Sequence, residues 1–215
     1  MASAGRRKLA AVPYPLPKRA LDKVVAATLL VLLSPMIALV LVAIVADMLV
    51  MRADRGPVFY REPRVSRGRT FALLKFRTLR SDTLARAGGH AGPLEHESAN
   101  LTWSGRRFLK PWYLDELPQL FNVLRGDISL VGPRPWPPEL VARQLANGRD
   151  YRNRIVAGLT GPAQVTKGSG QSYEDLDLQY VEACGSLGGW ALVRYDIAII
   201  RRTLAVMARG EGLNY

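Results

Sequence analysis

Two adjacent carboxylates, Asp115 and Glu116, are the residues of this chain whose type and spacing best suit chemistry. Apolar residues follow them at helical spacing, at Leu117, Leu120, Phe121 and Leu124. Pro118 suits a first helical turn, where a missing N–H group costs nothing. We therefore expect the acid pair at or just before a helix N-terminus, where free amides and the helix dipole favour negative charge and phosphate.

A stiff turn is predicted after this helix, and it would hold the guanidinium group of Arg134 in a fixed position. Gly126 is predicted to end the helix, and Gly132-Pro133-Arg134-Pro135 follows it. Because proline fixes its own φ, this turn has little freedom. An acid pair, a helix start and an arginine turn together could bind a phosphate group with the help of a metal ion. The alternative is that Asp115 and Glu116 only stabilise the helix start, where acids are common.

The run from Asp115 to Pro135 closely resembles the signature of the bacterial sugar transferases, the monotopic phosphoglycosyl transferases. Those enzymes move a sugar phosphate from a nucleotide sugar to a polyprenyl phosphate. The resemblance extends from Lys18 to about the C-terminus. It implies that this chain transfers a sugar-1-phosphate from a UDP-sugar to a polyprenyl phosphate, releases UMP and so initiates glycoconjugate or exopolysaccharide assembly.

The same resemblance implies a mechanism. Asp115 would attack the β-phosphorus to give a covalent aspartyl-phosphosugar intermediate, and Glu116 would coordinate Mg²⁺, with Asp115 sharing it. A carboxylate that approaches an anionic diphosphate needs such a metal, and basic groups, to offset the repulsion. The implied substrate-binding residues are Lys75, Arg77, Arg134, Gln164 and Thr102. Adjacency alone leaves the reverse assignment, with Glu116 as the nucleophile, open.

An uncharged segment from Val24 to Ala46 exceeds the roughly 20 residues that a helix needs to cross a bilayer. Ser34-Pro35 lies in its middle and predicts a kink. Basic residues flank both ends, namely Arg6, Arg7, Lys8, Lys18, Arg19 and Lys23 before it and Arg52, Arg55, Arg61 and Arg64 after it. A spanning helix would carry one cluster outside, against the positive-inside tendency, whereas a re-entrant one keeps both on the cytoplasmic side. These observations leave both forms open.

The resemblance includes Lys18-Arg19 before this segment and Ser34-Pro35 within it, and it implies the re-entrant form. We therefore expect a basic arm over 1–17, a re-entrant membrane hairpin over 18–51 and a catalytic domain over 52–215. The enzyme would be monotopic on the cytoplasmic face of a bacterial cell membrane. The expected fold class is α+β, mainly helical with a small β-hairpin, the re-entrant segment and interfacial helices.

Two strands, 58–60 and 70–77, are predicted around a Ser66-Arg67-Gly68 turn. Lys75 and Arg77 alternate with apolar residues, so they share one face and could point together at a phosphate. The alternative is that both are solvated strand charges. Glu62 stands near this turn where the family usually has glutamine.

In the last third, Glu139–Asn147, Tyr173–Val181 and Trp190–Met207 are predicted helices. The last carries an apolar stripe beside arginines, which fits an interfacial helix or a core-facing one with a solvated back. Between the first two, Gly158–Val165 resembles a family segment. Its glycines favour close backbone approach to a ligand, with Gln164 reading a uracil edge or a sugar hydroxyl; a tight structural turn is the alternative.

Charge and rare residues limit the function classes. The 215 residues carry a formal net charge of +12, which suits nucleic acid, an anionic membrane or phosphorylated substrates. The single cysteine, Cys184, excludes an internal disulfide and is expected to be a small buried or inert residue, and His90 and His96 are expected in a surface loop. The expected partners are a UDP-sugar, a polyprenyl phosphate and an anionic leaflet, and homo-oligomerisation stays open. Two alternatives are a basic membrane adaptor without chemistry and a nucleic-acid binder, although no nucleic-acid-binding motif is present.

Overall fold

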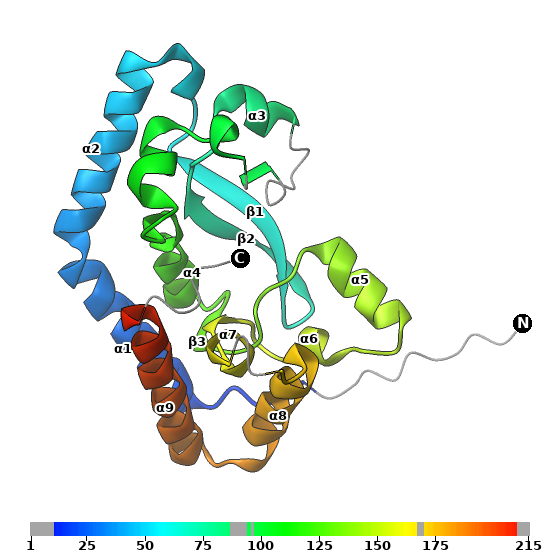
Figure 1. Ribbon diagram of the computed structural model, residues 1–215. Helices are drawn as coiled ribbons and strands as arrows, with labels where there is room; N and C mark the ends of the chain where they lie inside the picture. The colour runs from blue at the N-terminus through cyan, green and yellow to red at the C-terminus, as the bar shows by residue number, and fades with distance from the viewer. Residues whose placement is uncertain (1–10, 87–93, 96, 167–169, 210–215) are drawn as a thin grey trace, which may run out of the picture. The chain divides into compact units, whose positions relative to one another are not determined.

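The computed structural model describes residues 11–86, 94, 95, 97–166 and 170–209, which are mainly helical (Figure 1). The helices are α1 (Leu16–Leu32), α2 (Ser34–Val50), α3 (Ser81–Arg86), α4 (Gln119–Arg125), α5 (Pro138–Ala146), α6 (Tyr151–Arg154), α7 (Pro162–Val165), α8 (Tyr173–Ser186) and α9 (Gly189–Ala208). Short helical turns are η1 (Arg52–Asp54), η3 (Ser98–Asn100), η4 (Gly105–Leu109) and η5 (Leu114–Glu116). The strands β1 (Phe59–Ser66) and β2 (Arg69–Phe76) form one sheet, and β3 (Ser129–Val131) and β4 (Gly158–Thr160) form another. The expected class, mainly helical with a small β-hairpin, is confirmed.

The chain divides into two compact units. We call Leu21–Arg64 with Phe71–Asp127 the acid-pair unit. We call Met1–Ala20, Val65–Thr70 and Ile128–Tyr215 the arginine-turn unit. The predicted division at residues 18, 51 and 52 stays a prediction and differs from the boundaries of these units.

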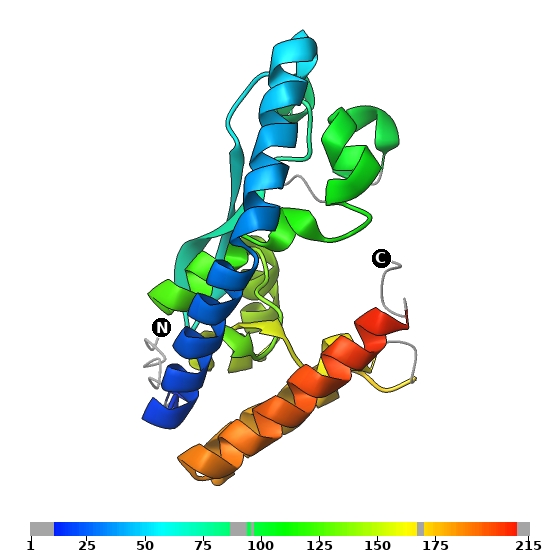
Figure 2. The same cartoon turned by 90° about the vertical axis from the view of Figure 1, so that its left-hand side faces the viewer.

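Ser34 and Pro35 break the N-terminal helical run as predicted. Proline has no N–H to donate to the carbonyl of Val31, four residues earlier, so the helical ladder is interrupted there. The Ser34 hydroxyl donates to that carbonyl instead, at 2.8 Å. Helices α1 and α2 meet at this break with a bend of 61° (Figures 1 and 2). In the described part of the chain no helix alone has the length and hydropathy of a membrane span, and this bent pair meets that test only when taken together.

Helix α2 carries apolar side chains on two faces, one packed in the core and one exposed. Val40 and Ile44 are buried in the core of the acid-pair unit, against Phe76 of β2 and Leu109 of η4. Large apolar side chains elsewhere on the helix are exposed, namely Leu39, Val42, Val45, Leu49 and Val50. Soluble monomers rarely leave a large contiguous apolar surface exposed. The second face of α2 is therefore suited to an apolar environment.

The predicted hairpin turn is confirmed. Arg67 and Gly68 connect β1 and β2 with φ values of 49° and 72°. Positive φ at both central residues belongs to the tight turns that match the twist of paired strands. The first strand is longer than predicted, and the second ends at Phe76, so Arg77 lies just beyond it.

The arginine-turn unit contains a parallel pair of short strands, with Ser129 opposite Gly158 and Val131 opposite Thr160. A Cβ atom on Gly158 would lie 2.0 Å from the backbone nitrogen of Gly132, so only glycine fits at this crossing. The glycine-containing segment after residue 157 therefore approaches the chain's own backbone. This observation favours a tight structural turn over close approach to a ligand in the segment Gly158–Val165.

A buried ion pair joins the start of α1 to α9 within the arginine-turn unit. Lys18, which the sequence placed among the flanking basic residues, is 3% exposed, and its Nζ lies 2.5 Å from Asp196 Oδ2. Lys18 Nζ and the Tyr180 hydroxyl both donate to the carbonyl of Val131 at 3.1 Å. The end of β3, directly before the arginine turn, is thus fixed by two side chains.

Helix α9 begins as a core helix and ends as an exposed one. Leu192 and Ile199 are buried, whereas Leu204 and Met207 are 61% and 53% exposed. The structure thus confirms the predicted helix and gives its first part the core-facing role.

Asn122 fixes helix α4 against strand β2. Its side-chain amide donates to the carbonyl of Ala72 and accepts from the N–H of Leu74, both at 2.9 Å. Asn122 is fully buried. Its two hydrogen bonds satisfy one backbone N–H and one backbone C=O of β2, as a neighbouring strand would otherwise do. The helix that follows the acid pair is thereby held beside the strand that carries Lys75.

Replacing Asn122 with alanine should destabilise the protein by about 2 kcal/mol, because two buried backbone groups lose their partners. The midpoint of thermal unfolding, followed by circular dichroism, measures the loss. Asn147→Ala, at an exposed position of α5's end, is the control and should shift stability by less than about 0.5 kcal/mol. Equal, small effects of both substitutions would contradict this role of Asn122.

Candidate active site

The acid pair lies in η5, immediately before α4, as the helical pattern predicted. Gly126 ends α4 with φ 81°, which also matches the prediction. Directly before η5, Tyr113 adopts a left-handed conformation with φ 54°. A bulky residue with positive φ is an outlier, and such strained positions concentrate at functional sites. The backbone that leads into Asp115 is therefore held in a costly conformation by its surroundings.

Asp115 is a buried carboxylate with a lysine partner. It is 2% exposed, and its Oδ2 lies 3.1 Å from Lys110 Nζ. Burial raises the pKa of Asp115 to about 6; Lys110 and Lys75 oppose this rise, and Glu116 adds to it. Asp115 is consequently ionised at neutral pH and takes up a proton in mildly acidic solution.

Lys110 is itself held by two acids. Its ammonium contacts Glu95 as well as Asp115. Burial acts to lower the pKa of Lys110, but the two carboxylates outweigh it and raise the pKa above its ordinary value. Lys110 therefore stays charged and keeps the Asp115 carboxylate in one orientation.

The structure places Lys75 beside the second acid, and its predicted binding of a substrate phosphate stays a prediction. Lys75 Nζ lies 3.8 Å from Glu116 Oε1 and 3.9 Å from Glu62 Oε2. Arg64 contacts the other oxygen of Glu62 at 2.6 Å. The two lysines thus face the two members of the acid pair, one each.

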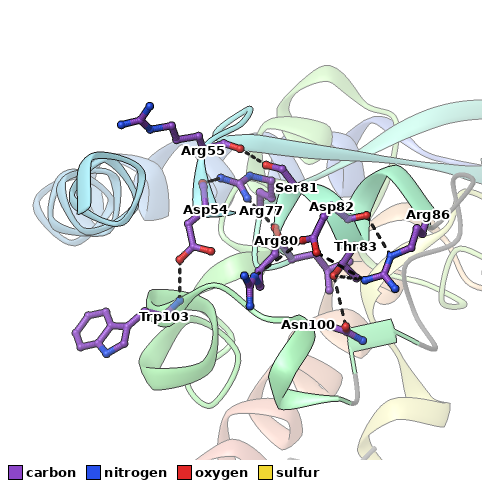
Figure 3. Close-up of polar contacts among 11 residues, drawn as sticks. Asp54, Arg55, Arg77, Arg80, Ser81, Asp82, Thr83, Arg86, Asn100 and Trp103 are labelled. Atoms are coloured by element: carbon purple, nitrogen blue, oxygen red, sulfur yellow. Dashed lines mark hydrogen bonds and ion pairs between the residues drawn. The ribbon is translucent and has the colours of Figure 1, made fainter. Parts of the chain in front are cut away.

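Arg77 has backbone partners instead of an open position. Its guanidinium donates to the carbonyls of Pro57 and Leu79, both at 2.7 Å. It also donates to the carbonyl of Asp54, and Figure 3 shows Arg77 beside Asp54. The residue is 1% exposed, and burial lowers its pKa. These contacts tie η1 to the end of β2. A role of Arg77 in phosphate binding stays a prediction, and we leave Arg77 out of the proposed site.

Thr102 caps the helical segment that leads to the acid pair. It is 2% exposed, and its hydroxyl accepts a hydrogen bond from Gly105 N–H at 3.0 Å. Asp47, at the end of α2, accepts from Ser104 N–H at 2.8 Å in the same turn. Satisfying free amides in this way stabilises a helix start. Substrate binding by Thr102 stays a prediction beside this structural contact.

Arg134 and Gln164 belong to the arginine-turn unit. The carbonyl of Arg134 accepts from Arg152 Nη1 at 2.5 Å, which helps to fix the turn. Both amide atoms of Gln164 are buried and have no hydrogen-bond partner among the described residues. An amide in this state favours a bound polar group, because an unpaired buried donor or acceptor is costly. Their binding roles stay predictions.

Sequence reasoning missed Lys110, Glu62 and the strain at Tyr113. Lys110 stands five residues before Asp115 and gave no periodic signal that would pair the two. Glu62 was noted only as a departure from the family's usual glutamine. Cys184 was predicted correctly: it is buried, and burial raises its pKa to about 11. The surface-loop prediction for His90 and His96 falls outside the described residues.

The donor set suits a magnesium ion that is shared with a substrate. Among the described residues no group of three or more His, Cys, Asp or Glu side chains could hold a metal. Magnesium in phosphate-handling sites is commonly bound by one or two carboxylates together with substrate phosphates and water. Asp115 and Glu116 supply those two carboxylates. Magnesium binding stays a prediction that this geometry can accommodate.

Comparison with known proteins by sequence places this chain in one family. The sequence model described as Bacterial sugar transferase matches residues 14–210. The chain is 37% identical over 207 residues to undecaprenyl-phosphate glucose phosphotransferase of Komagataeibacter xylinus, which covers 88% of this chain and 35% of that protein. It is 36% identical over 200 residues to UDP-glucose:undecaprenyl-phosphate glucose-1-phosphate transferase of Caulobacter vibrioides, covering 90% and 70%.

A third relative is similar along most of its length. The exopolysaccharide production protein ExoY of Sinorhizobium fredii is 30% identical over 213 residues, covering 91% of this chain and 87% of that protein. Several other curated relatives are much longer, and the chain spans only 35 to 41% of their length.

Replacing Lys110 with methionine should raise the pKa of Asp115 above its present value of about 6, because the positive charge that opposes the effect of burial is lost. Carbon-13 NMR of protein labelled at the aspartate carboxyl groups measures the titration, and Asp115→Asn assigns the signal. Lys110→Arg keeps the charge and serves as the control. A pKa that stays unchanged or falls in the methionine variant would contradict the pairing.

Proposed function

The chain belongs to the bacterial sugar transferase family, and from this we propose that it moves a sugar-1-phosphate from a UDP-sugar to a polyprenyl phosphate with release of UMP. The printed names of two relatives describe such transfer to undecaprenyl phosphate. The observation that carries the proposal is the acid pair at a helix start, in which Asp115 is buried beside Lys110 and Glu116 faces Lys75.

In the proposed first step an Asp115 carboxylate oxygen bonds to the β-phosphorus of the UDP-sugar. The bond between that phosphorus and the bridging oxygen breaks, and UMP leaves with the electron pair. A polyprenyl phosphate oxygen then attacks the same phosphorus, so that the bond to Asp115 breaks and the carboxylate is regenerated. A carboxylate is a usable covalent nucleophile once the repulsion between it and the diphosphate is offset.

Five further residues have a proposed part in this transfer. Lys110 keeps Asp115 ionised and oriented, because their ion pair is buried. Lys75 supplies positive charge where the departing phosphate gains negative charge. Arg134 is proposed to bind a substrate phosphate and Gln164 a polar group of the nucleotide or the sugar. When bound, magnesium held by Glu116, with Asp115 sharing it, would neutralise charge on the diphosphate.

The bent pair α1–α2 is proposed as the membrane segment, entering and leaving on the cytoplasmic face. Support comes from the 61° bend and from the exposed apolar residues of α2. Each basic residue near an anionic leaflet contributes on the order of 1 kcal/mol, which favours keeping both flanking clusters on one side. A re-entrant segment of this kind would hold the acid pair level with the lipid phosphate.

Replacing Asp115 with asparagine should lower the rate of UMP release by at least about a thousandfold, because the nucleophile is lost while the side-chain volume is kept. The assay measures UMP released from a panel of UDP-sugars in the presence of a polyprenyl phosphate. Asp175→Asn, at an exposed acid of α8, is the matched control and should retain full activity. Turnover by the Asp115→Asn protein at the rate of the natural chain would refute the mechanism.

Cysteine labelling distinguishes a re-entrant from a spanning segment. In a Cys184→Ala background, Lys8→Cys and Arg52→Cys place one thiol before and one after the helix pair. The re-entrant form predicts that a membrane-impermeant maleimide labels neither thiol in intact cells and both after lysis. A spanning helix would leave one of the two thiols accessible from outside, and labelling of either one in intact cells would reject the re-entrant form.

A further inference from the structure

Glu62 is a buried acid that the proposed mechanism does not use. It lies in β1 and is 6% exposed. Burying an ionised carboxylate is costly unless it is paired, and Glu62 has two cationic neighbours, Arg64 and Lys75. Arg64 is the closer of the two, at 2.6 Å, and it fixes one oxygen of Glu62. The other oxygen faces Lys75, which also faces the acid pair.

Lys75 lies between two carboxylates at nearly equal distances. Its Nζ is 3.9 Å from Glu62 and 3.8 Å from Glu116. Both distances exceed the usual range of about 2.7–3.2 Å for a hydrogen bond from nitrogen. The ammonium group therefore has a direct bond to neither acid.

We propose that Glu62 is a positioning residue that holds the Lys75 ammonium back from Glu116. Lys75 and Glu62 are largely buried, where charges attract more strongly than in water, so loss of the attraction by Glu62 would let Lys75 close onto Glu116. Closure would occupy Glu116 and withdraw Lys75 from a diphosphate. Glu62 prevents closure because it attracts the same ammonium from the other side, and Arg64 keeps Glu62 in place.

This inference rests on the proposed function, in which Glu116 and Lys75 both act on the diphosphate. It adds that their separation is maintained by a third acid in β1. Glu62→Gln removes the charge and keeps the shape, so Lys75 should move toward Glu116. Arg64→Met releases Glu62 and should have the opposite effect, drawing Lys75 away from Glu116.

The first measurement is structural and independent of turnover. High-resolution structures of the natural protein and of the two variants give the distance from Lys75 Nζ to Glu116. We expect it to shorten to about 3 Å, a direct hydrogen bond, in Glu62→Gln. In Arg64→Met it should lengthen. An unchanged distance in both variants would overturn the inference even if the enzyme proves to be a phosphoglycosyl transferase.

The second measurement is kinetic. Glu62→Gln should lower kcat for UMP release about tenfold without raising KM for the UDP-sugar, because removing a negative charge does not weaken the attraction of an anionic substrate. In a Lys75→Met background the same substitution should have less than about a twofold effect, because Glu62 acts through Lys75. Glu182→Gln, at an exposed acid of α8, is the control and should leave kcat unchanged.

The outcomes separate the two proposals. A tenfold loss in both backgrounds would mean that Glu62 supports the fold and does not position Lys75, and it would overturn the inference. Unchanged kcat and KM in Glu62→Gln would overturn it as well. Failure of the natural protein to release UMP from any UDP-sugar would count against the proposed function, and the structural measurement would still decide whether Glu62 holds Lys75 back.

Discussion

The pairing of a buried carboxylate with a lysine is the interaction on which the site depends. Asp115 is almost fully removed from water, and an unpaired charge in that position would be expelled or neutralised. Lys110 makes the burial tolerable, at 3.1 Å, and Glu95 holds Lys110 in turn. Lys110 directly follows the helical turn η4, and the left-handed residue Tyr113 lies between Lys110 and Asp115. This backbone path allows the lysine to contact the acid. The result is a carboxylate that is largely dehydrated and fixed in orientation.

Two other constraints position this pair. Asn122 binds the backbone of β2 and so fixes α4, whose start carries the acids, beside the strand that carries Lys75. Asp47 at the end of α2 accepts from Ser104 N–H at the start of the segment that leads to η5. The proposed membrane helix and the catalytic segment thus share a hydrogen bond within one unit. A movement of α2 would reach the acid pair through the short stretch of chain between Ser104 and Asp115.

The sequence predicted those features that local rules determine. Pro118 and Gly126 bounded the helix after the acids, Pro35 placed the break, and Arg67-Gly68 formed the hairpin turn. Each of these depends on backbone preferences of one or two residues. The resemblance to a family then supplied the roles, which no local rule contains.

What could not be predicted depends on contacts between residues distant in sequence. Lys18 is buried against Asp196, whereas the sequence placed it only among the basic residues that flank the apolar segment. Arg77 donates to the carbonyls of Asp54 in η1 and of Pro57 and Leu79 in loops, although strand alternation placed it beside Lys75. Periodicity gives the face of an element on which a residue lies. It does not give the partner that packs there, and for charged residues the partner decides the role.

We propose, as the central step, that Asp115 carries the migrating phosphosugar as a covalent acyl phosphate, a mixed anhydride of its carboxyl group. Intact-mass analysis of protein mixed with a UDP-sugar and no polyprenyl phosphate, quenched rapidly and mapped by peptide fragmentation, tests it most directly. We predict an added sugar phosphate on the peptide that contains Asp115, which disappears when polyprenyl phosphate is supplied. Release of UMP without any adduct, or an adduct mapped to Glu116, would contradict the account.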